Sequence, residues 1–414
     1  MHRNKVRGIA TLVASAMVTV AIPAATRAQS APTPVAQNLH EAVEVAAGRS
    51  SENASLPALR AQADALRRAA RGPFAGPPVV AADLLTRSNG IIEEEASVSA
   101  GIRWPGEGRA LRVYAGRTGD LAQSALEAAR LRIAGEVREA WWALAGARAA
   151  LAVDRDQVRI AATNASQVSR LVSAGEQARR DLLLARAEAS AAQSRLSQAD
   201  GELARAEAAY AALAGPPPDQ LPPEAQAEVT NFENNPALRA ALDRAAVAEA
   251  RASSLSYGAR SRLEGTIGVR RERSGASDPT LGREPFRSAL LAGVKIPIGR
   301  NQVAVADSAL ARSEALAAGA DANRIRIRLF AEQRAAQLRL DAARRSFEQA
   351  QARHDSLLES LALTERGRAE GEFGFIEALR ARQTLSEAER DLAAARVAQF
   401  AAISSFNQAM GVLP

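Results

Sequence analysis

Residues 182–213 read LLLARAEASAAQSRLSQADGELARAEAAYAAL. Apolar side chains recur in this stretch at alternating steps of three and four residues, at Leu182, Ala185, Ala189, Ala192, Leu196, Ala199, Leu203, Ala206, Tyr210 and Leu213. A seam with this period keeps one face of a helix against a partner while both helices supercoil, so the stretch predicts coiled-coil packing. Because alanine dominates the seam, we expect the helix axes to lie close together.

The same pattern returns 196 residues later (378 − 182), in residues 378–409, where nine of the ten matching positions are apolar. The offset aligns Gly175 with Gly371 and Gly215 with Gly411 without a gap. A self-similarity of this length indicates that one structural unit is used twice. We therefore predict two repeats, residues 39–215 and 235–414, joined by a Pro-rich linker over residues 216–234.

Each repeat is expected to contain one very long helix and a shorter return helix. The seam extends back through residues 108–175 with Asp154 as its one break, and residues 300–370 match it. At 1.5 Å per residue each long helix would measure roughly 100 Å. The return helices, 175–215 and 371–411, are shorter, so the short opening helices are expected to stack end to end with them. These opening helices are 39–71, with an interruption over 48–57, and 235–259.

Two segments before the long helices change to a period of two. In residues 95–104 apolar side chains alternate with polar ones, and residues 286–298 do the same. Such alternation indicates strands with one apolar face. We expect each strand to pair with another strand just upstream, which predicts β-hairpins at about 78–104 and 263–298. Strands of about ten residues match a membrane span, but four strands cannot close a barrel. Because open edges are not tolerated in lipid, several chains would have to share one barrel.

Composition excludes several classes of protein and site. The 414-residue chain has no cysteine, which excludes disulfides, thiolate metal sites and lipid attachment at an N-terminal cysteine. Residues 1–28 combine a basic start, an apolar run over 9–25 and a small-residue end, which is typical of a secretory signal peptide. The alternative for this segment is an uncleaved membrane anchor. Residues 29–38 are then a Pro-rich tether.

Charge argues against nucleic acid as a partner. The formal net charge is +7, and the expected signal peptide carries four of these positive charges and no acid, which leaves +3. Arginine otherwise alternates with glutamate along the helices, as on a solvated helix face, and there is no basic stripe with interleaved aromatic residues. We therefore expect no nucleic-acid binding.

No pattern in the sequence indicates catalysis. His40 stands alone, and His354 falls on the helical seam at the position that matches Val158. The acidic residues and serines lack the spacing of a nucleophile, a metal site or a phosphate loop. The sequence thus predicts that the protein is not an enzyme and has no cofactor or metal site.

The signal peptide, the tandem repeat of short helix, hairpin, long helix and return helix, and the missing cysteine together resemble the TolC family of outer-membrane efflux channels. The resemblance implies a mostly α fold with a membrane β-barrel portion, a homotrimer with a 12-stranded barrel in the outer membrane of a Gram-negative bacterium, and a helical tunnel in the periplasm. A periplasmic adaptor and an inner-membrane RND-type pump would be its partners. The segment Arg103–Arg109 resembles the CzcC-like subgroup, which implies efflux of heavy-metal cations.

The resemblance also suggests candidate residues at the turns between the long and return helices. Glu377 would form an acidic aperture ring, Asp181 would pair with a neighbouring arginine, and Arg380 occupies the next inward position. Acids at a helix start are equally explained by the helix dipole.

A second set of candidates would dock the adaptor at the tip. It comprises Gly175, Gly371, Phe373 and Phe375, with local packing of the rings as a comparable alternative. The alternative for the whole chain is a secreted or periplasmic coiled-coil adhesin or scaffold. Such a protein shares the signal peptide and the seam but has no use for the hairpins.

Overall fold

The computed structural model describes residues 35–88, 91–228, 231–273, 277–278, 282–283 and 285–414, without the side chains of 51–56, 277–278 and 282–283. The expected signal peptide and residues 29–34 of the expected tether lie outside the described residues. Val35–Pro414 form one compact unit.

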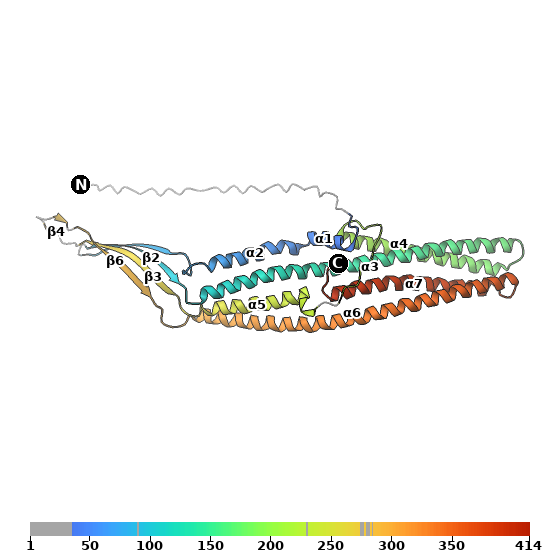
Figure 1. Cartoon of the computed structure of the whole chain (residues 1–414). Coiled ribbons are helices and arrows are strands. Elements are labelled where there is room, and N and C mark those ends of the chain that lie inside the picture. The colour runs from blue at the N-terminus through green and yellow to red at the C-terminus, as the bar shows by residue number, and fades with distance from the viewer. Residues whose placement is uncertain (1–34, 89–90, 229–230, 274–276, 279–281, 284) are drawn as a thin grey trace, which may run out of the picture. The chain divides into compact units, whose positions relative to one another are not determined.

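Seven α-helices dominate the described part of this unit (Figure 1). They are α1 (Leu39–Arg49), α2 (Ser51–Ala69), α3 (Glu107–Ser173), α4 (Arg179–Ala214), α5 (Pro236–Ser256), α6 (Gln302–Glu370) and α7 (Phe375–Ala409), with a 3-10 turn η1 (Phe232–Asn234) before α5. The strands are β1 (Val79–Thr86), β2 (Ile92–Ile102), β3 (Leu263–Arg273) and β6 (Arg287–Lys295), with the two-residue strands β4 (Ser277–Asp278) and β5 (Gly282–Arg283) between β3 and β6. The element order helix, hairpin, long helix and return helix therefore occurs twice.

The long helices organise the packing of the others. The return helix α4 packs along α3 and α7 packs along α6, while α2 and α5 lie against α3, and α5 also lies against α6. The predicted fold class of long antiparallel helix pairs with two β-hairpins is confirmed. The expected interruption over residues 48–57 is wrong in its extent, because only Ser50 separates α1 from α2 and Pro57 lies inside α2. Proline removes one backbone hydrogen bond from α2, and α2 packs against α3.

The expected end-to-end stacking is present where α7 meets α5. The Asn235 side chain caps α5 by accepting a 3.0 Å hydrogen bond from the backbone N–H of Ala237. Its Nδ2 donates to the carbonyl oxygen of Ala409 at 3.4 Å. Asn235 is 2% exposed, so one buried side chain joins the start of α5 to the end of α7.

The predicted alanine seam is buried at every seventh residue of α4. Ala185 and Ala192 are each 1% exposed, and Ala199 and Ala206 are each 8% exposed. A strict seven-residue repeat of this kind holds one face of α4 against α3 along the helix.

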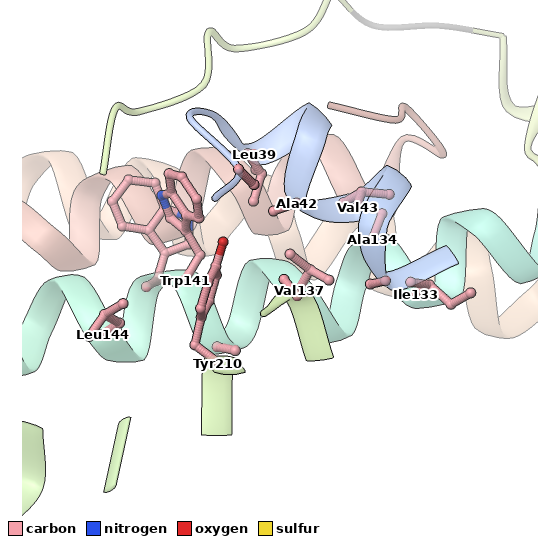
Figure 2. Packing of buried hydrophobic residues seen from close by; sticks show 14 of the residues in the cluster. Leu39, Ala42, Val43, Ile133, Ala134, Val137, Trp141, Leu144 and Tyr210 are labelled. Carbon is pink, nitrogen blue, oxygen red and sulfur yellow. The ribbon is translucent and has the colours of Figure 1, made fainter. Parts of the chain in front are cut away.

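The largest apolar cluster joins α1, α3 and α4, as Figure 2 shows. Trp141 of α3 and Tyr210 of α4 are fully buried and face each other with ring centroids 6.0 Å apart. Burial raises the pKa of Tyr210 to about 12, and the charge of Arg148 opposes that rise. Leu39, Ala42 and Val43 bring α1 against these rings. The return helix is therefore anchored near its end by the short helix that opens the same repeat.

Candidate functional site

The four main strands form one antiparallel sheet in the order β1-β2-β3-β6. The two hairpins of the two repeats thus meet through β2 and β3, which pair over their whole length from Ile92↔Arg273 to Ile102↔Leu263. β1 and β6 are the edges of this sheet, and within the described part of the chain neither has a second neighbour. Both edges of the described sheet are therefore unpaired.

One face of the sheet is apolar and exposed. Directly paired residues point to the same side of a sheet, and the register places apolar side chains in continuous rows across all four strands. One row is Val80, Val98, Ile267 and Ala292, and the next is Ala82, Ala96, Val269 and Leu290. Val80 is 74%, Ile267 72% and Leu290 87% exposed. An exposed apolar face of this extent indicates a binding or membrane surface.

The opposite face carries polar and charged side chains on the two central strands, including Ser97 and Thr266, and apolar side chains on the edge strands, including Val79 and Leu291. Near the β1–β2 turn, Glu93 is 8% exposed. Its carboxylate forms one ion pair with Arg87 at 2.6 Å and a second with Arg270 of β3. The two arginines come from different hairpins. The ion pairs of Glu93 thus join the hairpins at the end of the sheet farthest from the helices, a role that the sequence pattern did not indicate.

At the opposite ends of the long helices, Gly175 and Gly371 take the same conformation. Their φ angles are +79° and +86°, a region that favours glycine. The next residue in each case donates its backbone N–H back into the helix, from Glu176 to Leu171 at 2.9 Å and from Glu372 to Gly367 at 2.8 Å. This is the Schellman arrangement of helix ends. The two glycines therefore reverse the chain at both tips.

The two candidate aromatic residues differ in their surroundings. Phe375 is 6% exposed and packs with Val168 of α3 and Ala185 of α4. Phe373 is 44% exposed, and its ring lies against Gly367, where a Cβ atom would come within 2.5 Å of the ring. Phe375 thus joins the two helix pairs near the tips, while Phe373 offers an accessible ring.

The candidate charged residues occupy the first turns of the return helices. The Asp181 side chain is 13% exposed, and its Oδ1 lies 3.6 Å from Nε of Arg180, the adjacent residue. Glu377 is exposed in the first turn of α7, and Arg380 is exposed one turn further on. The structure of one chain thus keeps Asp181 beside an arginine and leaves Glu377 and Arg380 exposed.

Asp154, the single break in the α3 seam, has a partner that the sequence did not indicate. Its Oδ1 accepts a 3.2 Å hydrogen bond from Nε of Arg390 on α7. Close by, Gln157 of α3 donates to Glu389 of α7 at 2.5 Å, and Gln383 of α7 donates to Glu188 of α4 at 2.7 Å. These bonds join the first helix pair to the second. A polar residue inside an apolar seam was the available signal for this contact.

The inter-repeat linker is held by a buried ion pair that sequence analysis also missed. Arg138 of α3 is 3% exposed and donates to both carboxylate oxygens of Glu224 in the linker, at 2.9 and 2.8 Å. Asn407 of α7 donates to the same carboxylate at 3.1 Å and to the carbonyl oxygen of Ala225 at 2.8 Å, and its Oδ1 accepts the N–H of Ala227 at 2.8 Å. We call these residues the linker clamp.

Electrostatics in the linker clamp favour the charged form of Glu224. Burial raises the pKa of Glu224, but the hydrogen bonds and charge of Arg138, with the hydrogen bonds of Ser404 and Asn407, outweigh this effect. The pKa therefore lies below its ordinary value. Two further arginines hold other parts of the linker, since Arg148 donates to the carbonyl oxygen of Pro218 at 2.7 Å and its repeat counterpart Arg344 donates to Gln226 at 2.5 Å.

The described residues contain no group of three or more His, Asp or Glu side chains that could hold a metal ion. His354 is partly buried beside Asp355, with Nδ1 3.0 Å from its carboxylate. Within the same part of the chain, no helix is both long and apolar enough to span a membrane.

Comparison with known proteins gives structural matches. No protein-family profile and no curated protein matches the sequence. The crystallised protein CusC, studied for folding and transmembrane channel formation, matches with a TM-score of 0.71 at 16% identity, over 92% of this chain and 94% of CusC. The outer membrane protein VceC of Vibrio cholerae matches with a TM-score of 0.70 at 17% identity, over 90% of this chain and 96% of VceC.

The outer membrane channel CmeC of Campylobacter jejuni gives a similar result. Its TM-score is 0.69 at 15% identity, over 91% of this chain and 86% of CmeC. Identities at this level establish the fold alone. The chain therefore has the fold of the TolC family of outer-membrane channels.

Proposed function

We propose that the chain is one protomer of a trimeric outer-membrane channel that serves as the exit duct of a tripartite efflux system. The observation that carries the proposal is the open four-stranded sheet with its exposed apolar face. Exposure of such a face to water is unfavourable by about 25 cal/mol per Å² of apolar surface. Contact with lipid removes that cost.

Lipid contact requires that no sheet edge remains open, because backbone N–H and C=O groups find no partners in hydrocarbon. Three copies of the four-stranded sheet would supply twelve strands and bring β6 of each protomer against β1 of the next. The apolar rows would then face lipid, and the face with Ser97 and Thr266 would line the pore. β2 and β3, with 11 residues each, are long enough to cross an outer membrane.

The helices would continue the pore as a tunnel through the periplasm of a Gram-negative bacterium. The tips at Gly175 and Gly371 lie at the ends of α3 and α6 away from the sheet, where a periplasmic adaptor would dock and connect the tunnel to an inner-membrane RND-type pump. In this assembly Glu377 would line the aperture, and Phe373 and Phe375 would belong to the docking tip. The role is transport, and it requires no catalysis by this chain.

The resemblance of Arg103–Arg109 to the heavy-metal subgroup supports a metal cation as one candidate cargo. In the structure this segment joins β2 to α3. Arg103 donates to the carbonyl oxygen of Gly72 at 3.1 Å, and the backbone N–H of Trp104 donates to Glu107 at 3.2 Å. These bonds give the segment a structural task whatever the cargo.

The proposal is tested by the native mass and the conductance of the full chain. Protein extracted in detergent from the outer-membrane fraction should have the mass of three chains and should form discrete conducting channels in planar lipid bilayers. A soluble monomer or dimer that never partitions with membranes would contradict the proposal. That result would favour the coiled-coil scaffold.

A further inference from the structure

A cavity of about 740 Å³ lies among five helices, at the level where α7 ends and α5 begins. Residues 125–132 of α3, 237–244 of α5, 325–339 of α6 and the last turn of α7 contribute to its walls, with Leu59 of α2. The volume is within the range of pockets that hold drug-sized molecules. Neither the linker clamp nor the helical tips line this cavity.

Charge in the cavity is strongly one-sided. Among the described residues, four arginines line it, Arg132, Arg244, Arg328 and Arg339, against one acidic residue, Glu332. Glu332 is already paired with Arg328 at 3.5 Å on the same helix. Arg132 pairs with Glu136 of α3. Among the described residues, the four arginines therefore carry more positive charge than the acidic side chains around the cavity neutralise.

Arg244 and Arg339 supply the excess. Both side chains are exposed, they lie on different helices, α5 and α6, and among the described residues neither takes part in an ion pair. The first turn of α5 also lines the cavity through Asn235 and Ala237. A helix N-terminus carries partial positive charge and favours anions. The last turn of α7 lines the cavity as well, and the partial negative charge of a helix C-terminus opposes that of the α5 start, so the two guanidinium groups supply the net positive potential.

The remaining walls are apolar. Leu126 and Leu131 of α3 and Ile325 and Leu329 of α6 line the cavity together with several alanines. Guanidinium groups bind carboxylate, sulfonate or phosphate through paired hydrogen bonds, while the leucines favour a hydrocarbon or aromatic body. The arrangement is complementary to a molecule that has both parts.

We propose that this cavity binds soluble amphipathic organic anions, molecules with an apolar body and one carboxylate, sulfonate or phosphate group. Binding to the cavity does not depend on the proposed function.

The test is calorimetric titration of the full chain in phosphatidylcholine nanodiscs with naphthalene-1-sulfonate, compared with the cation 1-naphthylmethylammonium. We expect the sulfonate to bind and the ammonium not to bind. The double variant Arg244→Gln/Arg339→Gln should weaken sulfonate binding about 10-fold or more, as expected for lost hydrogen bonds to a charged group. Arg244→Lys/Arg339→Lys, which keeps the charge, should lose less.

Arg345→Gln is the matched control, because Arg345 is an exposed arginine of α6 that does not line the cavity. It should bind like the wild type, and native mass checks that every variant assembles alike. Equal binding of the sulfonate and the ammonium, or unchanged binding by the double glutamine variant, would overturn the proposal.

Two further measurements, one with an anionic lipid and one of conductance, separate this proposal from a bound lipid and from the proposed function. If phosphatidylglycerol in the discs abolishes sulfonate binding, the cavity holds an anionic lipid instead of a soluble anion and the proposal is overturned. Channel formation is measured separately in planar bilayers. A conducting channel without sulfonate binding therefore refutes only this inference, and sulfonate binding without conductance refutes only the proposed function.

Discussion

Replacement of Arg138 by glutamine should release the inter-repeat linker from α3. Arg138 and the carboxylate of Glu224 are 4% and 10% exposed at their side chains, and they share two hydrogen bonds of 2.9 and 2.8 Å. A third bond, from Arg138 to Gln408 at 2.6 Å, is lost as well. Breaking a buried pair by removing one partner costs about 3–5 kcal/mol, because the other charge stays buried without compensation.

The linker can relieve that cost by moving Glu224 into water, so the variant should lower the free energy of local opening. Hydrogen exchange measured by mass spectrometry reports this opening at the N–H of Ala227, which is bonded to Asn407. A change of about 3 kcal/mol corresponds to exchange roughly 150-fold faster.

Arg155→Gln is the control. Arg155 is exposed on the same helix and pairs with Asp200 at 3.8 Å, a surface contact worth about 0–1 kcal/mol. If Arg138→Gln and Arg155→Gln leave linker exchange equally unchanged, the reasoning about the linker clamp is refuted.

Three other predictions concern the aperture, the tip and pH. Glu377→Ala should reduce cation preference in single-channel recordings, since it removes a repeated negative charge from the aperture, and an unchanged reversal potential would dismiss that role. Phe373→Ala should lose crosslinking to the adaptor while the trimer stays intact. This variant is a cleaner probe than Phe375→Ala, because Phe375 also packs against α3 and α4. Undiminished crosslinking in both variants would exclude docking through these rings. The pKa of Glu224 lies below its ordinary 4.5, so its stabilising contribution is complete above about pH 4.5 and is lost as the pH falls through the lowered value in the folded protein. The difference in linker exchange between wild type and Arg138→Gln should therefore shrink in acid, and a difference that persists at the lowest pH would contradict the assignment.

Periodicity made the architecture predictable. The seam of alternating steps predicted the helix pairs, and the alternating segments predicted the hairpins, because burial on one side imposes a period of 3.5 residues on coiled-coil helices and of two on strands. The faces of the strands also followed from this pattern. Ala96 and Val98, apolar residues of the alternating segment 95–104, lie on one face of the sheet together with Ile267.

Contacts between distant polar residues were not predictable in the same way. Arg138 and Glu224 are 86 residues apart, and Asp154 and Arg390 are 236 residues apart. Asp154 stands out as the one polar residue of the α3 seam, but no pattern points to its partner. On sequence alone, Arg138, Glu224 and Arg390 look like charges on a solvated helix or loop. Their partners are fixed only by how the two repeats pack. For the same reason the cavity with Arg244 and Arg339 was not apparent, since its arginines come from three helices.

Closure of one barrel by three chains underlies the proposed function, and disulfide crosslinking tests this closure directly. The chain has no cysteine, so introduced pairs act without background. Ala82 and Leu290 lie in one row on opposite edges of the sheet, three strand spacings or about 14 Å apart. A disulfide needs Cα atoms within about 7 Å, so it cannot form inside one sheet.

The measurement is gel electrophoresis without reductant, after oxidation in membranes, of chains that carry Ala82→Cys with Leu290→Cys, Ala292→Cys or Val294→Cys to allow for stagger between chains. The shared barrel predicts that at least one pair gives a ladder of dimer and trimer that collapses to monomer on reduction. Monomer alone for all three pairs, in protein shown to be in the outer membrane, would contradict the shared barrel.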